Sequence, residues 1–143
     1  MKRCRLVGAF LIALSASGFG QEARNESSPC PSFPCVVASI ALTDQTMSVS
    51  QVPIYTPPAT GLFRVVYYEE SLPSGPGYWI FTWNWTDDLK TEAFGPYELY
   101  PGDYFNDGIW GMRVLAGTPI TYTVTRSGGP GTYDLFATVE QLQ

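Results

Sequence analysis

The sequence predicts an all-β fold, an antiparallel β-sandwich, and three observations support this. Apolar and polar residues alternate through residues 109–142, between breaks rich in glycine and proline. Residues 78–86 place four aromatic side chains on one face of an extended segment. No eleven-residue window beyond the N-terminal apolar run has helical periodicity. Roughly seven to nine short strands with turns between them are typical of sandwiches and barrels.

The C-terminal third contains three alternating segments, Ile109–Leu115, Ile120–Arg126 and Thr132–Glu140. We expect the outer face of the middle segment to carry threonines 121, 123 and 125, which suit a solvated sheet surface. The apolar face of each segment is expected to point into the core. These faces hold Trp110, Met112, Val114, Ile120, Tyr122, Val124, Tyr133, Leu135, Ala137 and Val139.

Two further strands are expected early in the chain, at Cys35–Leu42 and Thr46–Tyr55. Pro53 places the second of them at a sheet edge, because proline cannot donate a ladder hydrogen bond. Leu62–Glu70 is predicted to lie in the middle of a sheet, since both of its faces carry large residues.

The next strand is expected at Tyr78–Thr86, between a proline- and glycine-rich loop and the pair Asp87-Asp88. The following stretch, Leu89–Asp107, is less regular and rich in tyrosine, proline and glycine. We expect it to hold one short strand and a long loop.

The N-terminus predicts export. Three basic residues precede an apolar run, Leu6–Ala16, that is too short to span a bilayer, and small residues follow it. We therefore predict a signal peptide over residues 1–20, a flexible polar leader over 21–34 and a β-sandwich domain over 35–143. The mature protein is expected to be secreted, either extracellular or periplasmic. No later segment is long and apolar enough to cross a membrane.

Charge excludes some partners. Removal of residues 1–20 leaves five basic residues against thirteen acidic ones, a net charge of −8. A chain this acidic should repel nucleic acid and anionic membranes. It also contains no histidine, which excludes Ser-His-Asp and Cys-His catalytic arrangements.

Two cysteines, Cys30 and Cys35, remain after the signal peptide. Export places them in an oxidising compartment, so a short-loop disulfide is the expected state. Metal binding by this pair is the weaker alternative, because zinc takes four ligands.

The aromatic face of residues 78–86 holds Trp79, Phe81, Trp83 and Trp85. An exposed row of this kind can stack sugar rings, whereas a buried one fills the core of a sandwich. The core interpretation is favoured for most of the row, because the opposite face is polar. Trp85 is nearest the strand end and the most exposed in this interpretation. The candidate ligand-binding residues are Trp85, Tyr78, Tyr100 and Tyr104.

Acidic loops offer a candidate calcium site. Asp103, Asn106 and Asp107 lie close together in sequence, and Asp87 or Asp88 is a candidate for a further ligand. Calcium takes six or more oxygen ligands, mostly from loops, but the spacing is not that of an EF-hand. The alternative is that these are solvated turn residues. No other cofactor is expected.

A glycan hydrolase can work with two carboxylates and no histidine. Glu69, Glu70, Glu98 and Asp103 are the nominal candidates, but nothing in the sequence pairs them. We interpret them as strand-end and loop carboxylates and assign no catalytic residue.

Periodicity leaves an immunoglobulin-like and a jelly-roll sandwich open, although the long-range cysteine pair around a tryptophan that marks immunoglobulin domains is absent. The run Tyr55–Tyr68 resembles the proline, glycine-aromatic, strand signature of complement-type globular heads in the tumour-necrosis-factor-like jelly-roll superfamily. Val114–Tyr122 is similar to a later hairpin of that superfamily, and Tyr133–Phe136 to its closing strand. The resemblance covers roughly residues 49–142. It implies a ten-strand jelly roll, often a homotrimer, that recognises partners without catalysis.

The sequence thus predicts a jelly-roll β-sandwich that acts as a non-catalytic binding or structural module for a carbohydrate or protein ligand. A small carboxylate-based glycan hydrolase and a subunit of an extracellular filament or surface oligomer are the alternatives. The predicted core consists of Phe63, Val65, Tyr67, Phe81, Trp83, Met112, Val114, Ile120, Tyr122, Val124, Leu135 and Val139.

Overall fold

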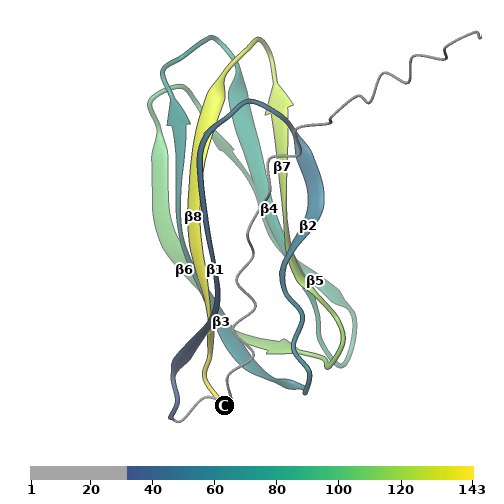
Figure 1. Cartoon of the computed structure of the whole chain (residues 1–143). Helices are drawn as coiled ribbons and strands as arrows, with labels where there is room; N and C mark the ends of the chain where they lie inside the picture. Colours follow the sequence, from purple (N-terminus) through teal and green to yellow (C-terminus); the bar gives the residue numbers. More distant parts are fainter. Residues whose placement is uncertain (1–31) are drawn as a thin grey trace, which may run out of the picture.

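A computed structural model describes residues 32–143 and gives two antiparallel four-stranded sheets packed face to face (Figure 1). The predicted signal peptide, nearly all of the predicted leader and Cys30 lie outside the described residues. Cys35 begins the first strand, and its predicted disulfide with Cys30 stays a prediction.

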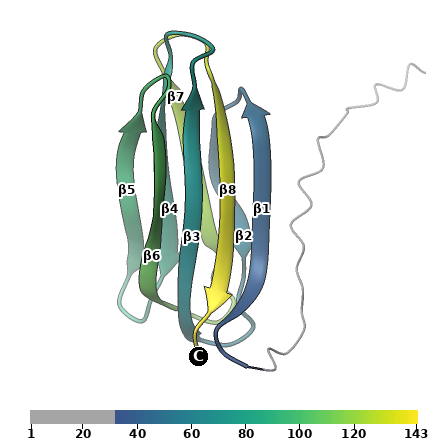
Figure 2. The same ribbon diagram turned by 90° about the vertical axis from the view of Figure 1, so that its left-hand side faces the viewer.

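All the regular elements of the described residues are strands, and no helix there is long and apolar enough to cross a membrane. In chain order they are β1 Cys35–Gln45, β2 Val49–Tyr55, β3 Gly61–Leu72, β4 Tyr78–Thr86, β5 Thr91–Leu99, β6 Tyr104–Val114, β7 Ile120–Ser127 and β8 Thr132–Gln141. Sheet A has the order β1-β8-β3-β6 and sheet B the order β2-β7-β4-β5. Figure 2 looks onto sheet A, with sheet B behind it.

The connections make this sandwich a jelly roll. Every pair of consecutive strands lies in opposite sheets except the β4–β5 hairpin. Interleaved Greek keys of this kind give the two four-stranded sheets of an eight-stranded jelly roll. The predicted fold class is therefore confirmed, and the open choice of topology is settled. Residues 32–143 form eight strands, compared with the ten that the family resemblance implies.

The core lies between the sheets, as period-two alternation requires. All twelve residues predicted for it are buried, none with more than 2% of its surface exposed. Trp79, Phe81 and Trp83 fill the same core, so the core interpretation of the aromatic face is confirmed for these three. Trp85, at the end of β4, is only partly buried and packs against the core from its edge.

Trp110 was predicted to share the buried face of Met112 and Val114, and this is wrong: it is 66% exposed. A β-bulge explains the difference. Ile109 pairs with Val65 and Met112 with Phe63, so Trp110 and Gly111 together oppose a single residue of β3. Gly111 adopts φ 69°, a conformation that glycine reaches without steric cost. The extra residue reverses the alternation, so Ile109 enters the core and Trp110 points outward.

The prediction for Leu89–Asp107 is also wrong, because this stretch holds all of β5 and the start of β6. Alternation in β5 is interrupted by Gly95, at φ 102°, and by Pro96, where the pairing with β4 shifts register. The alternation of apolar and polar residues is therefore lost at these two positions, although the backbone remains a strand from Thr91 to Leu99.

Other predictions about strand positions are confirmed. The strand with Pro53, β2, is an edge strand, and β3 lies inside sheet A between β8 and β6. One outward residue differs from expectation. Thr121 is only 8% exposed, whereas Thr125 is exposed. Thr121 lies in β7 between Pro53 of β2 and Asn84 of β4, so neighbouring strands flank it on both sides.

Candidate functional site

The outer face of sheet A is built around Tyr68 of β3. Because Phe63, Val65 and Tyr67 point into the core, alternation turns Tyr68 to the outside. Its partners in register are Asn106 on β6 and Phe136 on β8. Directly opposite residues of antiparallel strands lie on the same face, so side chains from three strands meet here.

Three rings form an aromatic row across these strands, which we define as Tyr104, Tyr68 and Phe136. The Tyr104 and Tyr68 ring centroids are 6.1 Å apart, and those of Tyr68 and Phe136 are 6.2 Å apart. Tyr104 is 68% exposed and Phe136 is 38% exposed. The row is therefore an apolar surface held in place by ring contacts and open to solvent.

Trp110 adds a fourth exposed ring on the same outer face. The Arg64 guanidinium lies 4.7 Å from its ring centroid. A Cβ on Gly108 would come within 3.2 Å of the indole nitrogen, so the absence of a side chain there leaves room for the ring. Arg64 also forms an ion pair with Glu140 of β8. The indole is thus held against the sheet by a cation that is itself neutralised.

Carboxylates lie beside the aromatic row. The Tyr68 hydroxyl donates to Glu70 at 2.7 Å, and this bond is the main reason that the pKa of Tyr68 is raised. Glu70 pairs in register with Tyr104 on one side and with Asp134 on the other. Asp134 accepts a hydrogen bond from the Asp44 backbone N–H at 2.8 Å. The outer face of sheet A therefore combines aromatic rings with acidic side chains.

The four predicted ligand-binding residues are divided between the two sheets. Tyr78 and Tyr100 stack at 5.0 Å, and the Tyr100 hydroxyl donates to Glu98 at 2.8 Å. Trp79 points into the core, so alternation places Tyr78 on the outer face of sheet B. Tyr104 belongs instead to the outer face of sheet A, and Trp85 to the edge of the core.

The predicted calcium ligands are placed on and beside β6. Asp103 accepts from the Tyr100 backbone N–H at 3.1 Å, and Asp107 from that of Gly108 at 2.7 Å. Asn106 and Asp107 are consecutive in the strand, so their side chains leave on opposite faces. Within residues 32–143, no three His, Cys, Asp or Glu side chains form a group that could hold a metal ion. Calcium binding stays a prediction.

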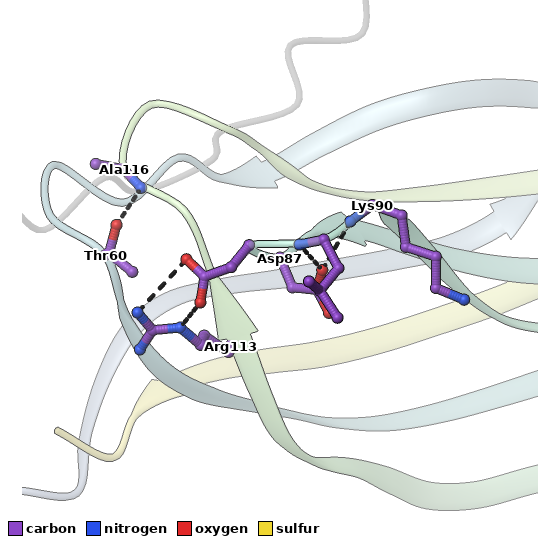
Figure 3. Close-up of polar contacts among 7 residues, drawn as sticks. Thr60, Asp87, Lys90, Arg113 and Ala116 are labelled. Atoms are coloured by element: carbon purple, nitrogen blue, oxygen red, sulfur yellow. Dashed lines mark hydrogen bonds and ion pairs between the residues drawn. The ribbon is translucent and has the colours of Figure 1, made fainter.

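The acidic pair Asp87-Asp88 is occupied by local contacts at one end of the sandwich (Figure 3). The Asp87 carboxylate accepts the backbone N–H groups of Leu89 and Lys90, at 2.8 and 2.9 Å, and these bonds lower its pKa. Asp88 forms an ion pair with Arg113. Asp87 therefore closes the β4–β5 turn, and Asp88 anchors the end of β6.

A buried carboxyl lies on the other side of β3. Glu69 has no exposed surface and accepts hydrogen bonds from the Trp83 indole N–H at 3.0 Å and the Tyr97 hydroxyl at 2.6 Å. Burial raises the pKa of Glu69 to about 8. The Tyr67 ring lies 5.2 Å from that of Trp83, and burial raises the pKa of Tyr67 to about 12.

The interpretation of Glu69 as a strand-end carboxylate did not anticipate that this side chain is fully buried. The signal that could have located it is its phase, because Glu69 continues the buried series of Phe63, Val65 and Tyr67 at intervals of two. A carboxyl with no exposed surface touches no glycan in this conformation. Its neighbour Glu70 points to the opposite side of the sheet, so these two carboxylates do not flank a common substrate position.

No protein-family model matches the chain, and no curated protein matches it in sequence. Among the surfaces described above, the outer face of sheet A is the one on which exposed aromatic rings from three neighbouring strands meet.

Proposed function

We propose that this protein is a secreted, non-catalytic binding module that holds a glycan chain against the outer face of sheet A. The observation that carries the proposal is the aromatic row of Tyr104, Tyr68 and Phe136, extended by the exposed ring of Trp110. Aromatic rings on a sheet surface present apolar faces on which the apolar faces of sugar rings stack.

The surroundings of the row support a polar ligand with apolar faces. Asn106 lies beside Tyr68, and Thr138 of β8 pairs with Val66 of β3 on the same face. Amide and hydroxyl groups can both donate and accept hydrogen bonds, which sugar hydroxyls require. A partner that was wholly apolar would leave these groups without hydrogen bonds when it covered them.

Soluble domains rarely expose large contiguous apolar patches, and such patches often mark binding sites. The outer face of sheet B provides the contrast. Its central positions are threonines, at 82 on β4 and at 121, 123 and 125 on β7. Sheet B carries only the stacked pair of Tyr78 and Tyr100 at one end of its outer face, whereas the rings of sheet A lie across β6, β3 and β8, which supports a recognition role for sheet A.

Binding to a panel of soluble polysaccharides, measured by calorimetry, tests the proposal. Tyr104→Ala and Trp110→Ala should each weaken binding about tenfold, or about 1.4 kcal/mol. Tyr100→Ala is the matched control, because it removes an exposed tyrosine from the other side of the molecule and should leave affinity unchanged. Equal losses in all three variants would contradict the proposal, and release of shortened products would favour the hydrolase alternative.

A further inference from the structure

We infer that the glycan held on sheet A carries protonated amino groups, so that the ligand is an amino-sugar polymer and not a neutral or acidic one. This inference rests on the proposed function and adds the charge of the ligand to it. Acidic and basic side chains are distributed unequally around the aromatic row.

Every basic residue of the described chain is already engaged by a protein group. Two of them, Arg64 and Arg113, lie on β3 and β6 of sheet A, and Figure 3 shows Arg113 directed at the neighbouring carboxylate of Asp88. The contacts in residues 32–143 are Arg64 with Glu140, Lys90 with Glu92, Arg113 with Asp88, and Arg126 with the Thr46 carbonyl and the Trp79 ring. The outer face of sheet A therefore offers no uncommitted cation to an acidic ligand.

The acidic side chains beside the row have no such partners. Glu70 receives its hydrogen bond from the Tyr68 hydroxyl and Asp134 receives one from a backbone N–H, and neither donor is charged. The two carboxylates face each other in register across β3 and β8, next to Tyr104 and Phe136. The aromatic row is therefore bordered by two negative charges that no cation in residues 32–143 neutralises.

Each repeating unit of an amino-sugar polymer can contact both the aromatic rings and the carboxylates beside them. The apolar face of its ring stacks on Tyr104, Tyr68 or Phe136, and its ammonium group reaches the neighbouring carboxylate. An ammonium near the face of a tyrosine ring is attracted by the ring as well. A neutral sugar would use only the rings, and an acidic sugar would be repelled by Glu70 and Asp134.

A basic peptide also carries ammonium groups on apolar stems. However, its flexible side chains lack a rigid ring that could stack on an aromatic side chain of the row, and fixing them costs rotamer entropy. The observations therefore favour the amino sugar, and a lysine oligomer serves as a competitor in the test.

Four probes of equal length test the inference with the full mature protein: a glucosamine oligomer, its N-acetylated form, a neutral glucose oligomer and a lysine oligomer. At low salt and a pH that keeps the amines protonated, the glucosamine oligomer should bind about tenfold more tightly than each of the other three. Its affinity should fall as salt is added, because charge attraction between exposed groups is screened.

Substitutions show which carboxylates attract the ammonium groups of the ligand. Glu70→Gln and Asp134→Asn should each weaken glucosamine binding about fivefold and leave binding of the neutral oligomer unchanged. Glu98→Gln is the matched control, because Glu98 also accepts from a tyrosine hydroxyl but lies on sheet B. It carries the same charge change and should have no effect on either ligand.

The other outcomes contradict the inference, and they show whether the charge assignment alone or the proposed function as well is wrong. Equal binding of the neutral or acetylated oligomer would overturn the charge assignment and leave the proposed function standing. Equal binding of the lysine oligomer, or equal losses in Glu98→Gln, would show a general attraction of polycations. Binding of none of the sugars would overturn the proposed function along with the inference.

Discussion

Two neighbouring glutamates on β3 have opposite environments. Glu69 is fully buried among aromatic residues, with hydrogen bonds from Trp83 and Tyr97. Glu70 lies on the outer face of the sheet, where the Tyr68 hydroxyl binds it. The covalent chemistry is identical, so the difference comes entirely from the alternation of side chains in a strand. A carboxylate on the inner face of the strand affects the free energy of unfolding, whereas one on the outer face is available to solvent and to a ligand.

The same comparison holds along the two faces of β3. The inward residues Phe63, Val65 and Tyr67 are at most 1% exposed, while the outward Arg64, Val66 and Tyr68 are only half-buried. A change on the inner face should therefore alter the free energy of unfolding, and a change on the outer face should alter binding. Substitutions on each of the two faces test this division.

The largest effect should come from ionising Glu69. Its folded pKa of about 8 exceeds the ordinary value of 4.5, so the folded state holds this proton more tightly than the unfolded state does. The stabilisation is fully present below pH 4.5 and is lost as the pH rises to about 8. At about 1.4 kcal/mol per pKa unit, the loss is on the order of 5 kcal/mol.

Glu69→Gln isolates this contribution from that of the other titrating groups. Glutamine has nearly the same shape as glutamate and keeps an oxygen that accepts the Trp83 N–H, but its side chain does not ionise. In urea denaturation from pH 4.5 to 8, the stability of the variant relative to the wild type should increase steadily. A difference that stays constant over this range would show that Glu69 does not titrate in a buried environment.

Truncation of the core should have the next largest effect. Leu135→Ala and Val124→Ala remove fully buried side chains, so each should reduce the free energy of unfolding by about 2–4 kcal/mol through lost burial and a remaining cavity. Thr125→Ser, at an exposed position adjacent to Val124, should cost less than about 0.5 kcal/mol. Denaturant unfolding of the three variants measures both values, and a comparable cost at Thr125 would contradict the strand register of β7.

Most of this architecture follows from local physical rules. Alternation identified the twelve core residues and the C-terminal strands, because a strand with one face in the core must repeat with a period of two. The rule failed where the backbone departed from regular pairing. Trp110 was assigned to the wrong face because one extra residue in a bulge is invisible to a fixed period. The strand expected within Leu89–Asp107 was predicted too short because Gly95 and Pro96 interrupt the pattern of β5.

The candidate site was less predictable for a different reason. Tyr104, Tyr68 and Phe136 come from three strands that are far apart in sequence, and only the pairing of β3 with β6 and β8 brings them together. Of these residues, the sequence drew attention to Tyr104 alone, and it grouped Tyr104 with Tyr78 and Tyr100 of the opposite side. Period-two patterns assign a residue to a face, but the order of strands in the sheet decides its neighbours.

The bulge that turns Trp110 outward should tolerate substitution at a moderate cost. Gly111→Ala should reduce the free energy of unfolding by about 1 kcal/mol, because φ 69° is unfavourable for a residue with a Cβ, even though no other group would be within 4 Å of it. Gly111→Asn should cost less, since asparagine adopts this conformation more readily. Thermal or chemical denaturation distinguishes the two, and equal stability of the wild type and Gly111→Ala would argue against the bulge.

The smallest effect is expected at the second glutamate of the comparison. Glu70→Gln removes a charge whose partner is an outward tyrosine hydroxyl, so the free energy of unfolding should change by less than about 0.5 kcal/mol. The same urea titrations measure it. A loss of stability as large as that of Leu135→Ala would mean that Glu70 contributes to the core, and the division between the inner and outer faces of β3 would then be wrong.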